Sequence, residues 1–337
     1  MKTAIVWDEA YAEHDTGGHP EGADRIATIV AYLEASNLWP QIDVVKPKPA
    51  TEADVLLVHT PAHLEMIRRA AQGGGHWIDA DTHVSPRSFA IALLAVGGAL
   101  TAVELWDEGE VPFALVRPPG HHATPDRAMG FCLFNNVAIA AASLLQRGYE
   151  RVAIIDWDVH HGNGTQAAFY DDRRVLFVSL HQWPHYPGSG WFDECGEGDG
   201  EGFTVNVPLP GGCTDGDYAF AFANVVEPIV RQFAPQAILV SAGQDPHRDD
   251  PLGGMDVTDA GFAHMALHSL ALAQELCEAR LALVLEGGYD RRASAAAVAA
   301  MLGALADERA HPVGKPQQRA MAAVERAVDA QKAYWEL

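Results

Sequence analysis

The amino-acid sequence predicts an α/β fold, a single domain built on a mostly parallel central β-sheet with flanking helices. Six short apolar runs rich in Val, Ile and Leu are typical of buried parallel strands; they cover residues 3–7, 113–116, 152–155, 175–180, 237–240 and 281–285. Longer Ala- and Leu-rich stretches with helical spacing lie between several of these runs, at 136–145, 218–233, 260–277 and 292–305. Strands that alternate with helices favour a parallel sheet. A final periodic stretch, about 317–335, predicts a C-terminal helix that packs back on the domain. We expect this single domain to span residues 1–337.

The composition is that of an ordinary globular protein with a strong acidic excess. Of the 337 residues, 48% are hydrophobic and 20% are charged, which is enough to build a sizeable core. The chain has 23 Lys and Arg against 45 Asp and Glu, a formal net charge of −22. This charge excludes a generic nucleic-acid-binding protein, which needs a basic surface to displace counterions from phosphates. A solvated acidic surface is a simpler explanation of the charge than the steering of cationic partners.

Cysteine usage and hydropathy predict a cytoplasmic protein without a membrane partner. Four widely spaced cysteines form no C-x-x-C pair, so neither a disulfide framework nor a cysteine zinc site is expected. The longest apolar runs, 89–100 and 295–306, are shorter than the ~18 residues of a membrane span. Acidic residues interrupt the first segment early, so we expect no secretory leader. A monomer and a homo-oligomer are both compatible with this sequence.

The first of four polar clusters follows the predicted strand at 152–155. In open α/β sheets, sites form at the carboxyl ends of strands. Extended alternation places Asp156, Asp158 and His160 on one side of the chain, where carboxylates and an imidazole can bind one divalent metal. An Asp-rich turn that caps a helix is the alternative explanation of this cluster.

A second cluster, at 241–247, follows the strand at 237–240 and supplies Asp245 as a third metal ligand. Two Asp and one His leave a fourth position of zinc open, which is the pattern of a catalytic site. Oxygen-rich ligands also accept iron(II) or cobalt(II). The alternative for Asp245 is a turn residue before Pro246.

A third cluster contains the adjacent histidines His121 and His122, which follow a Pro-Pro-Gly segment after the strand at 113–116. The prolines fix φ and present the histidines rigidly. Histidine exchanges a proton near neutral pH, and two neighbours can divide that work if their partners differ. Asp156 would favour the charged form of one, and Asn163 would orient the other without adding charge. The alternative is a pair of surface histidines.

The fourth cluster, Glu-Gly-Gly-Tyr at 286–289, follows the strand at 281–285. Glycines allow close backbone approach, so Tyr289 can aim its hydroxyl at a developing oxyanion; a glycine turn with a packed tyrosine is the alternative. Together the four clusters meet the needs of metal-assisted amide hydrolysis. The sequence lacks a Gly-x-Ser-x-Gly elbow, a phosphate loop and a dinucleotide fingerprint in suitable context.

The order of these motifs resembles the histone deacetylase superfamily, whose members have the arginase/deacetylase fold. The resemblance extends from about residue 6 to residue 301 and rests on matches at 19–21 with Arg25, 117–122, 130–136, 156–164, 178–181, 205–208, 250–252 and 286–289. Asn163, where class I members carry aspartate, is similar to class II and bacterial histone-deacetylase-like amidohydrolases.

The resemblance implies one Zn²⁺ per chain, held by Asp158, His160 and Asp245. It makes His122 the general base and acid, gives the His121–Asp156 pair an electrostatic role, and makes Tyr289 the donor to the acyl oxygen. The residues implied as catalytic are therefore His121, His122, Asp156, Asn163 and Tyr289.

A substrate channel and structural K⁺ sites also follow from the resemblance. Phe131 and Tyr186 occupy the positions of the aromatic walls, and the carbonyl of Gly130 would accept the amide N–H of the substrate. The implied channel residues are Gly130, Phe131, Tyr186, Leu252 and Gly288. One K⁺ site would match Asp156, Asp158, His160, Ser179 and Leu180, mostly through backbone oxygens. A second would match Phe169, Asp172, Val175 and Phe203.

Three residues depart from the common family pattern. Gln244 and Pro246 flank Asp245 where a Phe and a small residue are usual, which affects the substrate rim or the metal affinity. Leu252 stands where polyamine-specific members carry a glutamate gatekeeper, which argues against recognition of a cationic tail.

The sequence therefore predicts a zinc-dependent amide hydrolase that removes an acyl group from N-acyl-lysine or a similar small amide. Two alternatives stay open. An acetylpolyamine amidohydrolase is favoured by the net charge of −22 and opposed by Leu252. A non-catalytic metal-binding sensor or scaffold is opposed by the presence of His121, His122 and Tyr289 together.

Overall fold

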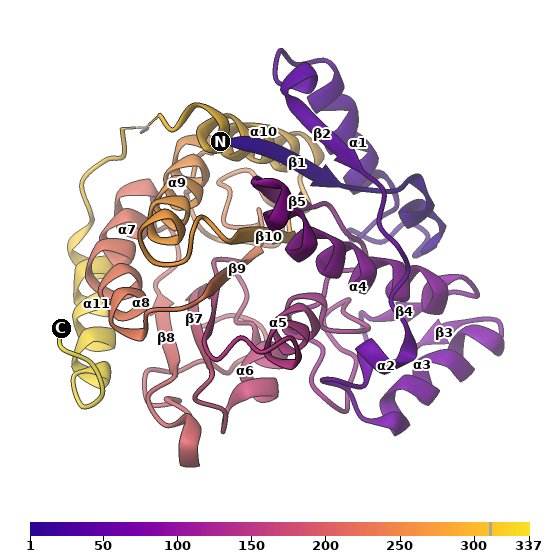
Figure 1. Cartoon of the computed structure of the whole chain (residues 1–337), viewed down its shortest axis with the longest axis horizontal. Helices are drawn as coiled ribbons and strands as arrows, with labels where there is room; N and C mark the ends of the chain where they lie inside the picture. Colours follow the sequence, from indigo (N-terminus) through magenta and orange to yellow (C-terminus); the bar gives the residue numbers. More distant parts are fainter. Residues whose placement is uncertain (310–311) are drawn as a thin grey trace.

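The centre of the molecule is an eight-stranded sheet in which every neighbouring pair is parallel (Figure 1). This computed structural model describes residues 1–309 and 312–337. The strands are β1 (Lys2–Val6), β2 (Ile42–Val45), β5 (Glu110–Ala114), β6 (Val152–Asp156), β7 (Val175–Gln182), β8 (Thr204–Leu209), β9 (Ala237–Ala242) and β10 (Leu281–Leu285). Their spatial order is β2-β1-β5-β10-β9-β6-β7-β8. A separate antiparallel pair joins β3 (His76–Trp77) and β4 (His83–Val84).

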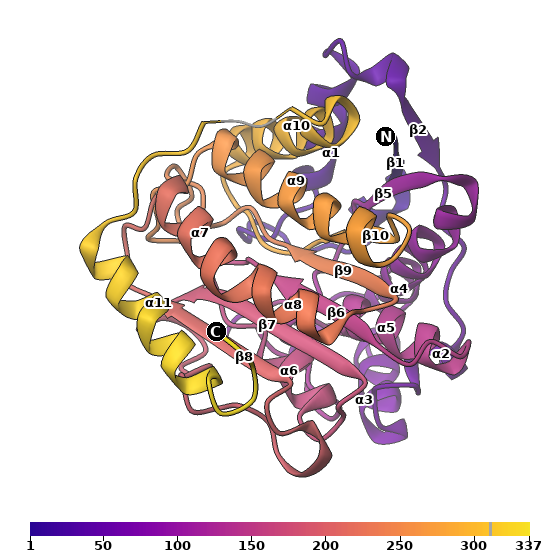
Figure 2. The same cartoon turned by 60° about the vertical axis from the view of Figure 1, so that its left-hand side comes forward.

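Helices cover both faces of the sheet (Figure 2). One face contacts α4 (Ser88–Glu104), α5 (Asn136–Gln146) and α6 (Asn163–Phe169), with α2 (Glu52–Val55) and α3 (Pro61–Gln72) packed outside α4. The other face is covered by α1 (Asp24–Glu34), α7 (Asp215–Ala221), α8 (Glu227–Phe233), α9 (Asp259–Leu276), α10 (Arg291–Asp307) and α11 (Gln318–Gln331). Short 3₁₀ turns are η1 (Glu9–Glu13), η2 (Trp39–Gln41), η3 (Leu105–Glu108) and η4 (Gly198–Gly200). Within the described part of the chain, no helix combines the length and apolar character needed to cross a membrane.

The fold confirms the predicted α/β class and all six predicted strands; the run at 281–285 has the predicted bounds and the other five have shifted ends. The edge strands β2 and β8 were not predicted because neither is a continuous apolar run. In β2 only Ile42 is buried. In β8 a polar Asn206 and a proline, Pro208, interrupt the pattern, and proline is tolerated there because an edge strand leaves one side of its backbone unpaired.

The helix predicted over 218–233 is in fact interrupted. The structure has α7, then a π-helical turn, η5 (Phe222–Val226), and then α8. Pro228 explains the interruption, because it lacks the N–H that would continue the α-helical ladder. A π turn is one of the ways in which a helix accommodates such a break.

The predicted C-terminal helix over 317–335 is shorter than expected and ends at Gln331. It lies against β8 and α7. The chain then turns back, and the indole N–H of Trp335 donates to the carbonyl of Gly202 at 2.9 Å. The Trp335 ring also contacts that of Phe203, with centroids 5.6 Å apart.

The sheet order explains how the four polar clusters meet. They follow β5, β10, β9 and β6, which are four consecutive neighbours at the middle of the sheet. Because all of these strands are parallel, their carboxyl ends lie side by side at the same end of the sheet. Clusters that are far apart in sequence therefore converge where a parallel sheet places its sites.

Candidate metal centre and active site

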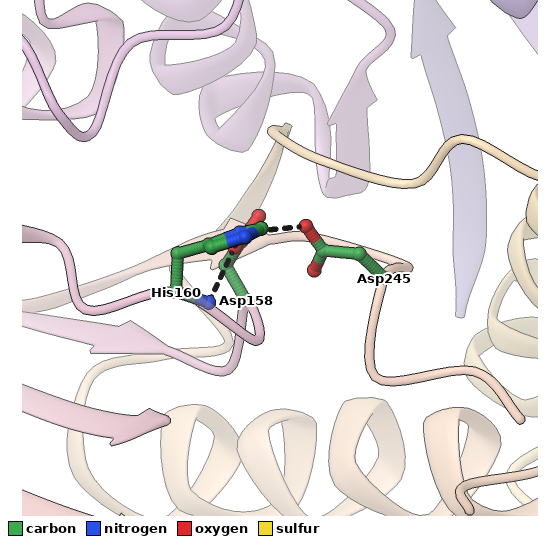
Figure 3. Close-up of side chains that lie close together, drawn as sticks. All are labelled: Asp158, His160 and Asp245. Carbon is green, nitrogen blue, oxygen red and sulfur yellow. Dashed lines mark hydrogen bonds and ion pairs between the residues drawn. The ribbon is translucent and has the colours of Figure 1, made fainter. Parts of the chain in front are cut away.

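Three metal-ligand side chains converge at the carboxyl ends of β6 and β9 (Figure 3). His160 Nδ1 lies 3.1 Å from Asp158 Oδ1 and 3.1 Å from Asp245 Oδ2. All three residues are buried, and their ligand atoms lie within 4.8 Å of one another. Among the described residues, this is the only group of three such side chains that converges in this way.

The surroundings of Asp158, His160 and Asp245 fit a divalent cation. A Cβ on Gly243 would overlap the Asp158 carboxylate, and one on Gly287 would overlap Asp245, so both glycines are needed to bring backbone up to the ligands. Burial lowers the pKa of His160, but its hydrogen bonds to Asp158 and Asp245 outweigh this and raise it to about 10. The position therefore strongly favours positive charge. Two carboxylates and one imidazole suit zinc with a further position left for water or substrate.

Backbone N–H groups fix the orientation of the metal-binding carboxylates. Asp245 Oδ1 accepts from the N–H of Val159 at 2.8 Å, and Asp158 Oδ2 accepts from that of Gly287 at 2.8 Å. The other oxygen of each carboxylate faces the His160 ring, and Asp158 Oδ1 also accepts the backbone N–H of His160 at 2.9 Å. Such outer hydrogen bonds hold metal ligands in place.

His121 is held as the charged member of the histidine pair. Its Nδ1 lies 2.9 Å from Asp156 Oδ2, and its Nε2 lies 3.7 Å from Asp158 Oδ1. Burial alone would lower the pKa of His121, but Asp158 and Asp156 raise it well above the ordinary histidine value. An imidazolium at this position supplies fixed positive charge.

His122 is held as the neutral member of the pair. Its Nδ1 lies 2.8 Å from Asn163 Oδ1, an amide oxygen that only accepts, so Nδ1 carries the proton and Nε2 keeps its lone pair. Burial and the charge of His121 lower the pKa of His122 well below the ordinary value. The two rings are 4.0 Å apart at their centroids. The partners predicted from sequence, Asp156 and Asn163, are thus the ones that distinguish the two histidines.

Tyr289 is positioned by two residues to which the sequence analysis gave no role. Its N–H donates to Asp250 Oδ2 at 2.5 Å, and its ring lies 4.8 Å from the guanidinium of Arg25. Arg25 also donates through Nε to the carbonyl of Gly288 at 2.7 Å. Burial raises the pKa of the Tyr289 hydroxyl well above its ordinary value, so the hydroxyl stays protonated as a donor. Both residues fall in matched motifs, but only their contacts show what they do.

The predicted aromatic walls lie on either side of the catalytic groups. The Phe131 ring meets that of Tyr289 edge-on, with centroids 5.6 Å apart, and the Tyr186 ring meets that of His122 at 5.1 Å. Gly130 has φ +55°, and a Cβ on it would overlap the His122 ring. Glycine at this position therefore allows the chain to pass close beside the base.

The remaining predicted channel residues lie on two neighbouring loops. The carbonyl of Leu252 accepts from His185 Nε2 at 3.0 Å, which connects the Leu252 loop to the segment that carries Tyr186. Gly288, with φ +118°, has no room for a side chain because Ser294 and Gln244 lie against it. The Gln244 side chain is fully buried and its amide donates to the carbonyl of Ala242, so it does not form part of an exposed substrate rim.

The residues of the two predicted K⁺ sites lie near opposite ends of the neighbouring strands β6, β7 and β8. Ser179 pairs with Asp156 across β7 and β6, beside the metal ligands. The second set lies near the amino ends of β7 and β8, where the N–H of Asp172 donates to the carbonyl of Phe169 at 3.1 Å and Val175 donates to Asp172 at 3.2 Å. Phe203 precedes β8, and its carbonyl accepts from Phe177 in β7.

Comparison with known proteins identifies the family. A family model described as a histone deacetylase domain matches residues 19–305. The chain belongs to the histone deacetylase family. Its deacetylase relatives include a probable deacetylase of Archaeoglobus fulgidus, 46% identical over 86% of this chain and 82% of that protein. A probable deacetylase of Methanothermobacter thermautotrophicus is 40% identical over 91% of this chain and 92% of that protein.

A solved structure of the family confirms the fold. The crystal structure of the HDA15 HD domain aligns with a TM-score of 0.93 and 37% identity, over 99% of this chain and 97% of that one. The predicted arginase/deacetylase fold is therefore correct. Membership of the histone deacetylase family also supports a hydrolase of the deacetylase type, as the sequence motifs indicated.

Proposed function

We propose that this chain is a zinc-dependent deacylase that hydrolyses the amide of N-acyl-lysine or a similar small amide. The observation that carries the proposal is the convergence of Asp158, His160 and Asp245 beside two histidines held in different protonation states. Bound Zn²⁺ would polarise the acyl carbonyl and lower the pKa of a coordinated water. We extend the proposal to the two structural K⁺ sites and to action in the cytoplasm.

The side chains around the metal ligands divide the remaining work. His122 accepts the proton of the attacking water at Nε2 and later donates it to the leaving amine. His121, kept charged by Asp156, stabilises the negative charge that develops in the transition state. The Tyr289 hydroxyl donates to the acyl oxygen as that oxygen gains charge.

An acetylpolyamine amidohydrolase is the second candidate, and one observation favours it. The Thr82 hydroxyl accepts from the N–H of the wall residue Phe131 at 3.2 Å. That hydroxyl donates to Asp81 Oδ1 at 3.1 Å and the N–H of Thr82 donates to Asp79 Oδ1 at 2.7 Å, so two acids lie beside the channel wall. These acids would attract a cationic substrate. Leu252, which adds no charge to the same rim, keeps acyl-lysine as the first candidate.

A turnover panel tests the proposal. The protein is stripped with a chelator, reloaded with zinc or iron(II), and offered acetyl-lysine, trifluoroacetyl-lysine, longer acyl-lysines and N-acetylspermidine, with and without a hydroxamate. We expect turnover that follows metal occupancy and stops with the hydroxamate. A chain that binds one zinc and hydrolyses none of these amides would instead support the sensor or scaffold.

A further inference from the structure

Glu286 is a buried carboxylate at the catalytic edge that the proposed chemistry does not use. It is the first residue after β10, and its side chain is fully shielded from solvent. Its Oε2 accepts from the backbone N–H groups of Gly120 at 2.7 Å and His121 at 3.1 Å. Its Oε1 accepts from the Ser241 hydroxyl at 3.2 Å. Both carboxylate oxygens of Glu286 therefore accept hydrogen bonds from the protein.

The place of β10 in the sheet gives these contacts a particular consequence. β10 lies between β5, which leads into the histidine segment, and β9, which carries Ser241. The Glu286 side chain thus bridges from the end of β10 to Ser241 within β9 and to the segment that follows β5. The backbone N–H groups of Gly120 and His121 both donate to the same oxygen of Glu286. This arrangement requires a strong acceptor on a side chain of the right length, extending from the end of β10.

The backbone next to Glu286 fixes the metal ligands and the tyrosine as well. The N–H of Gly287 donates to Asp158 Oδ2 at 2.8 Å, and the carbonyl of Glu286 accepts from Arg25 Nη2 at 2.7 Å. Tyr289 follows two residues after Gly287. One short segment therefore sets the metal-binding carboxylate, the histidine pair and the tyrosine relative to one another.

We propose that Glu286 is a positioning residue, whose two hydrogen bonds to the Gly120–His121 backbone hold His122 at its working distance from the metal ligands. This inference rests on the proposed deacylase function. In this role the length of the Glu286 side chain, rather than its charge, positions the backbone of the histidine segment. A general role in stability would not depend on side-chain length in this way.

Two variants separate reach from charge. Glu286→Gln keeps the length, one acceptor oxygen for the two N–H groups and an amide that can donate to Ser241, but it removes the charge. Glu286→Asp keeps the charge and is shorter by one methylene. We expect Glu286→Gln to retain nearly wild-type kcat. We expect Glu286→Asp to lose ~10²-fold in kcat at unchanged KM, the scale reported for small misplacements of reacting groups.

Controls exclude loss of fold or metal as the cause. Zinc content and melting temperature are measured for both variants, and Ser241→Ala removes the third hydrogen bond without touching the histidine segment. Ser241→Ala is expected to keep wild-type kcat. Imidazole ¹⁵N resonances of the zinc-loaded protein give a readout independent of turnover: the His122 signals should shift in Glu286→Asp and stay in place in Glu286→Gln.

The outcomes distinguish this inference from the proposed function. A kcat of Glu286→Asp equal to or above that of Glu286→Gln overturns the positioning role. If the zinc-loaded wild-type protein turns over no amide, the proposed function fails, and the resonances still decide whether Glu286 sets the histidine segment. Unmoved His122 signals in Glu286→Asp would then reject the inference.

Discussion

The floor of the candidate site and its rim are built by different means. On the floor, His121 and His122 are buried and each has a fixed hydrogen-bond partner. On the rim, Tyr186 is 37% exposed and lies in the loop between β7 and β8. The orientation of the floor side chains is therefore set by the requirement that buried polar groups have hydrogen-bond partners. The exposed rim side chains are not subject to that requirement.

This difference separates the residues that determine the reaction from the residues that determine the choice of substrate. Buried groups with fixed partners have set protonation states, and these define the reaction. Half-exposed side chains on loops define the substrate, and loops tolerate sequence change. Substitutions on the floor should therefore change kcat strongly, while those on the rim should change the preference among substrates by small factors.

The largest expected effect comes from removing a catalytic group on the floor. We expect His122→Ala and Tyr289→Phe each to lower kcat by ~10²–10³-fold, because each removes a proton carrier or donor needed in the transition state. Zinc content should stay near one per chain, since neither residue is a metal ligand. Steady-state kinetics with metal analysis measures both quantities.

His264→Ala serves as the matched control, because His264 lies on α9 and contacts His268 rather than the site. Unchanged turnover in His122→Ala or Tyr289→Phe would contradict the mechanism. Equal losses in His264→Ala would attribute the effect to general destabilisation.

A second prediction concerns a buried histidine that supports the floor from behind. His59 Nδ1 lies 3.0 Å from the carbonyl of Thr124, and its Nε2 accepts from the N–H of Asn135 at 2.8 Å. Burial lowers the pKa of His59 to about 3. The neutral ring is thus favoured in the folded state, so its contribution is complete above the unfolded pKa of about 6.5 and is lost as the pH falls toward 3.

From this shift we expect one such group to reduce the free energy of unfolding by about 2 kcal/mol between pH 7.5 and pH 5. Urea denaturation at the two pH values measures it. His59→Gln should be less stable at pH 7.5 but lose about 2 kcal/mol less on acidification than wild type. His76→Gln, at an exposed histidine, is the control. Identical acid sensitivity in wild type and His59→Gln would show that His59 does not resist protonation.

The site could be predicted from sequence best where polar residues directly follow buried strands. The motifs after β5, β6, β9 and β10 could be joined into one site because parallel strands end at one edge. The structure also gives His121 and His122 the separate partners expected from their neighbours. Both inferences need only strand direction and residue chemistry, which a single sequence contains.

The roles that could not be predicted from sequence depend on contacts between distant segments of the chain. Glu286, Asp250 and Arg25 were visible as motif letters, but their partners, Gly120, Tyr289 and Gly288, lie in other parts of the chain. No spacing rule indicates that the side chain of the residue after β10 reaches a backbone N–H after β5. The break at Pro228 was missed for a different reason, since apolar periodicity outweighed one proline in a long helical pattern.

The smallest expected effect, at Leu252, tests the rim. Leu252→Glu adds a carboxylate to a loop held to His185 by the backbone, so the loop should keep its position. We expect the ratio of kcat/KM for N-acetylspermidine over an acetyl-lysine peptide to rise about five-fold, because an exposed charge pair contributes up to about 1 kcal/mol. The gain should shrink at high salt, where surface charges are screened. Leu252→Gln introduces a side chain of the same size as glutamate but without its charge. It should leave the ratio near that of wild type. An equal rise in both variants would mean that loss of the leucine side chain, rather than the added charge, decides the preference, and the rim would then select by shape.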